Sequence, residues 1–219
     1  MHCVVTAGPT YEPLDEVRRL TNFSTGKLGS QLGDFLVAHG HQVTLLYGYY
    51  ATCHEPQKAQ RIIRFDTTTD LRTKLELLAK EKVDAVFHAA AVSDFAFGKI
   101  WERTATGELR EAKSGKISTR DGTLFAELVP TQKIIRNLRR LFPDACIVGW
   151  KYEVEGDRAS VIEKAAQQIQ ENRTNGCVAN GKAYGFGFGL VTADKETSHF
   201  SDTGELFAAL ETLARTPRL

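Results

Sequence analysis

The sequence predicts an α/β fold of three layers, in which helices cover both faces of a mostly parallel sheet. Short apolar runs rich in β-branched residues alternate with amphipathic helical segments along most of the chain. These runs are apolar at nearly every position, which is typical of strands buried on both faces rather than on one. Together the two patterns predict a Rossmann-like three-layer sandwich with a ligand crevice at the carboxyl ends of its strands.

The predicted elements follow in order. Strands are expected at residues 2–7, 42–47, 61–66, 83–90, 146–150 and 176–180. Helices are expected at residues 25–40, 68–82, 131–142 and 160–172, several of them opening on Ser or Thr caps. Residues 189–214 predict a hairpin that turns near Asp194 and Lys195, followed by a capped terminal helix.

One segment interrupts this alternation. Residues 98–130 are polar and rich in turn signals such as "KSGK" and "RDG", which predicts a β-rich flap inserted after the fourth core strand. The remainder is continuous, so the 219 residues are expected to form a single domain.

Composition excludes several classes of protein. The net charge is +1, which gives no electrostatic case for a nucleic-acid or an acidic-membrane partner. Apolar runs are far too short to span a membrane, so we expect a cytoplasmic location. The four cysteines show no CxxC pairing and are expected to be structural. The histidines show no metal-ligand spacing, and no metal site is expected from protein ligands.

The stretch "TNFSTGKLGSQLG", residues 21–33, raises the question of what it binds. It is not a P-loop, because Leu28 follows Gly26 and Lys27 where Ser or Thr is required. It is not the GxGxxG fingerprint either, since a long loop separates Gly8 from Gly26. A helix opening on small residues can bind a phosphate, or it can merely be capped and closely packed. The unusually long loop before the helix favours a binding site.

Three further stretches carry candidate site residues. In "VFHAAAVSDF" the small residues Ala90 and Ala91 allow a ligand close to the backbone, and Asp94 follows where strand ends meet the crevice; a packed strand with a turn cap is the alternative. His88 is expected to be a satisfied core histidine. The strand ends at Trp150 and Asn180 could hold a nucleobase or could complete the core.

Taken together, these stretches resemble the phosphopantothenoylcysteine synthetase family. "TAGPTYEPLDEVRRLTNFSTGKLG" is similar to the family's opening motif TAGxTxEPxDxVRxxxNxSSGxxG, with Thr25 in place of the second serine. "AAAVSDF", "KIST", "ELVPTQKII", "VGWKYEVE" and "VAN" follow in the family's order. The likeness therefore extends along nearly the whole chain.

The resemblance implies a ligase that condenses 4'-phosphopantothenate with cysteine through a nucleotide-activated acyl intermediate. It implies CTP or ATP as the co-substrate, Mg²⁺, and a homodimer with shared active sites. The chain begins at the synthetase strand, so we expect the stand-alone form, without the decarboxylase domain and its FMN.

The resemblance also implies roles for particular residues. The residues that would receive the nucleotide phosphates are Gly8, Ser24, Gly26 and Gly29, with Trp150 and Asn180 near the base. Asn22 would hold the acyl intermediate, and Lys116 on the flap would close on the substrates. The residues that would bind phosphopantothenate are Ala90, Ala91 and Asp94, with Arg18 reaching the site of the neighbouring subunit.

Two other hypotheses stay open at this stage. One is a catalytically silent nucleotide-binding homologue, against which the joint presence of Asn22, Asp94 and Lys116 argues. The other is an NAD(P) oxidoreductase, against which the absent GxGxxG and the aromatic end of "TLLYGYY" argue.

Overall fold

A central sheet of eight strands organises the molecule, whose computed structural model describes residues 1–55, 57–104, 106–112, 117 and 123–216. Its strands lie in the order β13-β12-β11-β10-β6-β1-β4-β5, and those from β5 to β11 are parallel. The parallel strands are β1 (His2–Ala7), β4 (Gln42–Gly48), β5 (Arg61–Phe65), β6 (Ala85–His88), β10 (Cys146–Tyr152) and β11 (Gly176–Asn180). In chain order they run 3-2-1-4-5-6, the arrangement of Rossmann folds, and the order reverses between β1 and β6.

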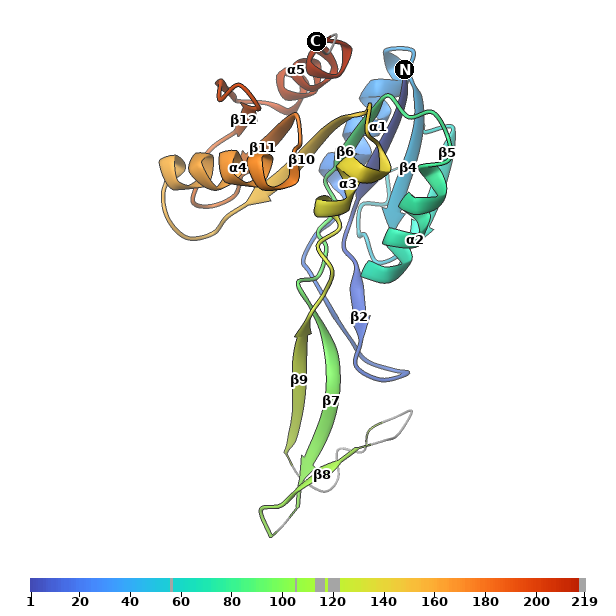
Figure 1. The fold of residues 1–219 in the computed structure, drawn as a ribbon, viewed down its shortest axis with the longest axis vertical. Coiled ribbons are helices and arrows are strands. Elements are labelled where there is room, and N and C mark those ends of the chain that lie inside the picture. Colours follow the sequence, from blue (N-terminus) through green and yellow to red (C-terminus); the bar gives the residue numbers. More distant parts are fainter. Residues whose placement is uncertain (56, 105, 113–116, 118–122, 217–219) are drawn as a thin grey trace.

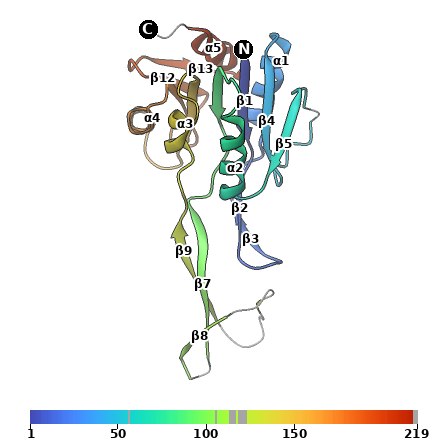
Figure 2. The ribbon, with the colours of Figure 1, turned by 45° about the vertical axis from the view of Figure 1, so that its right-hand side comes forward.

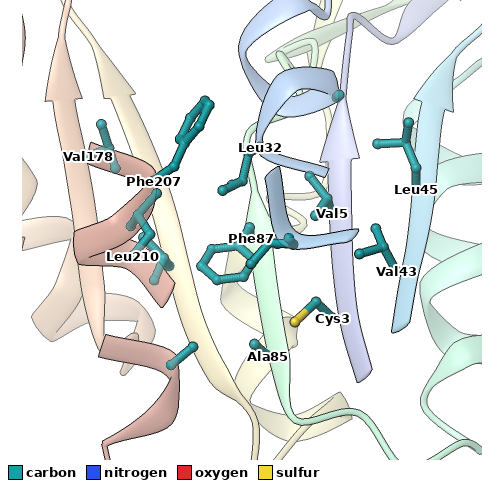
Figure 3. Packing of buried hydrophobic residues seen from close by; sticks show 14 of the residues in the cluster. Cys3, Val5, Leu32, Val43, Leu45, Ala85, Phe87, Val178, Phe207 and Leu210 are labelled. Carbon is teal, nitrogen blue, oxygen red and sulfur yellow. The ribbon is translucent and has the colours of Figure 1, made fainter. Parts of the chain in front are cut away.

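Helices cover both faces of this sheet, which confirms the three-layer fold (Figure 1). The helices are α1 (Lys27–Ala38), α2 (Thr68–Leu78), α3 (Ile135–Leu141), α4 (Arg158–Asn172) and α5 (Thr203–Arg215). Side chains of β1 alternate between the faces: Cys3 and Val5 pack with α1 and α5, whereas Val4 packs with α2 and α3. Figure 3 shows the first of these cores, with Leu32 of α1 and Leu210 of α5 over the sheet.

The predicted flap is a three-stranded antiparallel sheet that projects away from the body (Figures 1 and 2). It consists of β7 (Phe95–Arg103), β8 (Leu109–Glu111) and β9 (Leu124–Pro130), so it begins slightly earlier than predicted. Every residue of β9 after Leu124 is exposed, because this small sheet lies on no helix layer. The flap therefore has almost no core of its own.

The connection from β1 to α1 differs from the predicted open loop. Residues there form a hairpin of β2 (Tyr11–Pro13) and β3 (Arg19–Thr21). α1 then begins at Lys27, so Ser24 and Thr25 precede the helix instead of forming its first turn, which corrects the predicted start. The reason is Gly26, whose left-handed backbone (φ 77°) is incompatible with a helix interior.

The carboxyl-terminal region agrees with the sequence analysis. β12 (Phe188–Thr192) and β13 (Thr197–Phe200) form the antiparallel edge of the sheet, and Lys195 takes the left-handed conformation in their turn. α5 follows, capped by the side chain of Asp202. Cysteines 3, 53, 146 and 177 are not joined in disulfide bonds. In the described part of the chain no helix is long and apolar enough to cross a membrane.

Candidate active site

The reversal of strand order, where a ligand crevice is expected, falls at the carboxyl ends of β1 and β6. The chain beyond the two strands continues to pair: Ala91 N–H donates to the Gly8 carbonyl (3.0 Å) and Thr10 N–H donates to the Ala91 carbonyl (3.1 Å). Pro9 and Ala91 form an isolated parallel bridge between these bonds. The motif "TAGPTYEPLDEVRRLTNFSTGKLG" and the motif "AAAVSDF" therefore meet at the topological switch point, where ligands of such folds bind.

Asn22 joins this crevice from the far end of the hairpin. Its side-chain Nδ2 donates to the Ala91 carbonyl at 3.2 Å, while the residue itself is exposed. Three predicted site residues, Gly8, Asn22 and Ala91, thus come together although they lie in separate segments of the sequence. An exposed amide at this point can contact a ligand held over the strand ends.

The start of α1 opens toward the same crevice. Gly8 and Gly26 both have left-handed backbones, and a Cβ on either would come within 3.0 Å of Ala51 Cβ. The N-cap of α1 is Gly26, which has no side chain to accept from the helix N–H groups, whereas side chains cap α2, α4 and α5. The Thr25 hydroxyl accepts from the Lys27 N–H at 3.2 Å; the N–H groups that follow it and the positive end of the helix dipole favour an anion here.

Ser24 and Gly29, which are both predicted to receive the nucleotide phosphates, differ in their surroundings. Ser24 is half-buried just before the helix. Gly29 is buried against β1, where an added Cβ would lie 2.7 Å from Ala7 Cβ. The structure therefore gives Gly29 a packing role, which holds α1 close to the strand that ends at Gly8.

Hydrogen bonds fix the strand ends beneath the crevice. His88 is buried and its Nδ1 lies 2.9 Å from the Thr6 hydroxyl, while the same hydroxyl accepts from Ala90 N–H at 3.1 Å. Burial lowers the pKa of His88 to about 4, so its ring is neutral at physiological pH. The expected core role of His88 is confirmed.

Trp150 and Asn180 lie further along the sheet, two and three strands from β1, about 10 and 14 Å away at the usual strand spacing. Trp150 packs against the core under α1 and α5, and strand alternation places Asn180 on that same face, with Val178. Trp150 Nε1 and Asn180 Oδ1 are buried without a hydrogen-bond partner among the described residues. Orphaned polar atoms of this kind call for a ligand or water.

Asp94 has a partner that sequence reasoning missed. Lys133, just before α3, makes an ion pair with the Asp94 carboxylate, and both side chains are largely exposed. The backbone holds the two segments together, because Thr131 N–H donates to the Asp94 carbonyl at 2.9 Å. The whole flap separates these residues in sequence, so no local pattern could have paired them.

Of Arg18 and Lys116, the two residues expected to act from outside the crevice, the structure describes only Arg18. Arg18 sits at the hairpin tip, about 13 Å of extended chain from Asn22. Its guanidinium donates to Asp15 and, at 2.7 Å, to the Ile117 carbonyl. Hydrogen bonds from Arg18 hold the pKa of Asp15 well below its ordinary value. Lys116 lies outside the described residues.

The fold is that of a doubly wound α/β protein, with the candidate site residues gathered at its switch point. The chain matches the family described as "DNA/pantothenate metabolism flavoprotein C-terminal domain" over residues 1–208, and it belongs to that family. This membership confirms the resemblance to the phosphopantothenoylcysteine synthetases.

Known relatives agree with this assignment. The "Coenzyme A biosynthesis bifunctional protein CoaBC" of Thermococcus kodakarensis is 33% identical over 184 residues, covering 83% of this chain and 42% of the relative. The chain thus spans less than half the length of this relative and of the CoaBC protein of Bacillus subtilis. The DNA/pantothenate metabolism flavoprotein of Streptococcus pneumoniae has the same fold, with a TM-score of 0.82, 24% identity and 97% of each chain covered. The fold of a Cab2 mutant in complex with phosphopantothenate-cysteine matches with a TM-score of 0.71 at 19% identity, covering 97% of this chain and 87% of that one.

Proposed function

We propose that this chain is a phosphopantothenate-cysteine ligase of coenzyme A biosynthesis, acting in the cytoplasm with CTP or ATP as co-substrate. The observation that carries the proposal is the hydrogen bond from Asn22 to the Ala91 carbonyl, which joins the family's two most distinctive motifs at the switch point. The names of the relatives support the pathway.

The reaction has two balanced steps. A carboxylate oxygen of 4'-phosphopantothenate attacks the α-phosphorus of the nucleotide, and pyrophosphate leaves with the electron pair of the broken P–O bond. The cysteine amine then attacks the acyl carbon, the nucleoside monophosphate leaves, and the amine nitrogen loses a proton. Neither step needs a protein nucleophile, so positioning and charge stabilisation by the protein suffice.

Nucleotide and acid would occupy different parts of the crevice. The open start of α1 at Gly26 would receive phosphates, and the orphaned atoms of Trp150 and Asn180 would meet the base. A donor and an acceptor on the same face of adjacent strands would complement the amino-bearing edge of adenine as well as that of cytosine. Asn22 and Ala91 would hold the activated acyl group, with Asp94 nearby. We assign Lys116 to closure over the substrates, by resemblance alone.

Mg²⁺ would arrive with the nucleotide rather than at a resident site. Within the described ranges no three His, Cys, Asp or Glu side chains cluster to hold a metal ion. Asp94, the acidic residue at the crevice mouth, is already paired with Lys133. The donors in the described ranges therefore do not fit a resident metal centre.

A second copy of the chain would complete each site. The flap exposes apolar side chains at Phe95, Leu128 and Val129. Exposed apolar surface of this kind is typical of a site that another protein surface covers. Arg18 lies on the hairpin beside residue 117 of the flap segment and far from Asn22 of its own chain. A homodimer formed through these projections would bring Arg18 to the site of the other subunit.

Pyrophosphate release tests the proposal directly. The protein is assayed with 4'-phosphopantothenate, Mg²⁺ and either ATP or CTP, with and without cysteine. With at least one nucleotide, the wild type should release pyrophosphate over multiple turnovers, and only when cysteine is present. The isosteric variant Asn22→Asp serves as the matched control and should lose product formation. Release with neither nucleotide would favour the silent homologue instead.

A further inference from the structure

Glu12 is a buried carboxylate that the proposed reaction does not use. It lies on β2 with only 7% of its surface exposed, whereas no apolar residue from Pro13 to Phe23 is buried. Its Oε1 accepts from the N–H of Thr68, the first residue of α2, at 3.0 Å. A carboxylate at a helix start is favoured by the free N–H groups and the helix dipole. Glu12 therefore docks the hairpin onto α2.

Thr10 extends this docking to the crevice. Its side chain is fully buried, lies 3.3 Å from the Thr68 hydroxyl, and accepts from Ser93 N–H at 2.8 Å. Thr10 N–H donates to the Ala91 carbonyl, as described above. The segment of residues 10–12 is thus held between the start of α2 and the segment that follows β6.

Asn22 depends on the same segment. The Thr21 hydroxyl donates to the Thr10 carbonyl at 3.0 Å, and β3 pairs with β2. Because the hairpin beyond Glu12 has no buried apolar residue, polar contacts rather than a core fix its position. A shift of the hairpin would move the Asn22 amide relative to Ala91.

We propose that Glu12 is a positioning residue of the active site, whose docking on α2 sets the place of Asn22 over the Ala91 carbonyl. This inference rests on the proposed function of Asn22. Since a displacement of about 1 Å can cost about 100-fold in rate, removal of the carboxylate should lower kcat to that extent. The nucleotide KM should stay unchanged, because the start of α1 is held by other contacts.

Three variants test this role. Glu12→Ala removes the acceptor and is expected to lose about 100-fold in kcat, whereas Glu12→Gln keeps an acceptor oxygen and should retain most activity. Glu16→Ala changes an exposed glutamate at the tip of the same hairpin and serves as the matched control. A Glu12→Ala enzyme with normal kcat, or with kcat and nucleotide binding lost together, would overturn the proposal.

Hydrogen exchange separates this proposal from the ligase proposal. Amides of residues 10–23 should exchange faster in Glu12→Ala than in the wild type and in Glu16→Ala, while the rest of the chain stays protected. If the wild type shows no turnover, the ligase proposal fails, and the exchange of this segment decides the docking role by itself. Unchanged exchange over residues 10–23 would refute it.

Discussion

Gly29 of α1 lies so close to β1 that the helix has no room there for a methyl group. An added Cβ would be 2.7 Å from Ala7 Cβ and 3.2 Å from the Thr6 carbonyl oxygen. Both contacts belong to the central strand, which cannot yield. Gly33 offers a matched control one turn later, because its added Cβ would lie 3.8 Å from Val43 Cγ1, an ordinary contact.

The two substitutions should therefore change stability in opposite directions. Alanine in place of glycine in a helix interior gains about 0.5–1 kcal/mol, which Gly33→Ala should show in full. Gly29→Ala gains the same amount but forces α1 away from β1, and such overpacking costs about 1–3 kcal/mol. A net loss of about 1–2 kcal/mol is expected, so the free energies of unfolding of the two variants should differ by about 2 kcal/mol.

Urea unfolding followed by circular dichroism measures this difference, provided that the m-values agree. For a chain of this size the loss corresponds to a fall in Tm of about 3–6 °C. Nucleotide affinity should fall in Gly29→Ala as well, since the displaced helix carries Gly26 with it. Equal stability of the two variants would refute the reasoning, because it would mean that α1 is not held against β1 at Gly29.

Three further predictions follow from particular contacts. Arg139 donates to four backbone carbonyls, of residues 142, 143, 145 and 173, and to Asn175 Oδ1. Arg139→Lys should therefore lower the free energy of unfolding by about 1–3 kcal/mol. An unchanged urea midpoint would contradict this. The pKa of Asp15 is lower in the folded chain than in the unfolded one, so its contribution to stability is complete above about pH 4 and is lost as the pH falls further. The stability difference between wild type and Asp15→Asn should shrink below that pH, and a constant difference would disprove the linkage. Finally, Arg18→Ala and Asn22→Asp chains should each be inactive alone but recover about a quarter of the activity when mixed, because half of the dimers then hold one intact site; no recovery would place both residues in one subunit's site.

The parallel sheet could be predicted because its strands are buried on both faces. The run from Val83 to Ala90 is continuously apolar or small apart from Asp84 and His88, and β6 lies within it. The hairpin between β1 and α1 could not be predicted, since its strands of three residues are too short for any periodicity. Polar contacts such as that of Glu12 hold it, and hydropathy does not record them.

The sequence indicates candidate site residues but not the contacts between them. Asn22 and Ala91 stand in separate motifs, and only the crossing of β1, the hairpin and β6 brings the amide to the carbonyl. Lys133 pairs with Asp94 although the entire flap lies between them in the sequence. The orphaned atoms of Trp150 and Asn180 arise from packing, which a sequence does not contain. The roles of these residues stay predictions until they are tested.

The flap has a consequence for how activity depends on the amount of protein. β9 is exposed along nearly its whole length. In a single subunit the strands of the flap are therefore held together by backbone hydrogen bonds, with little apolar burial to stabilise them. In the homodimer that we propose, a partner subunit covering the sheet would stabilise it by mass action. Specific activity per chain should then fall on dilution, and assays at very low enzyme concentration would underestimate turnover even though every subunit remains folded.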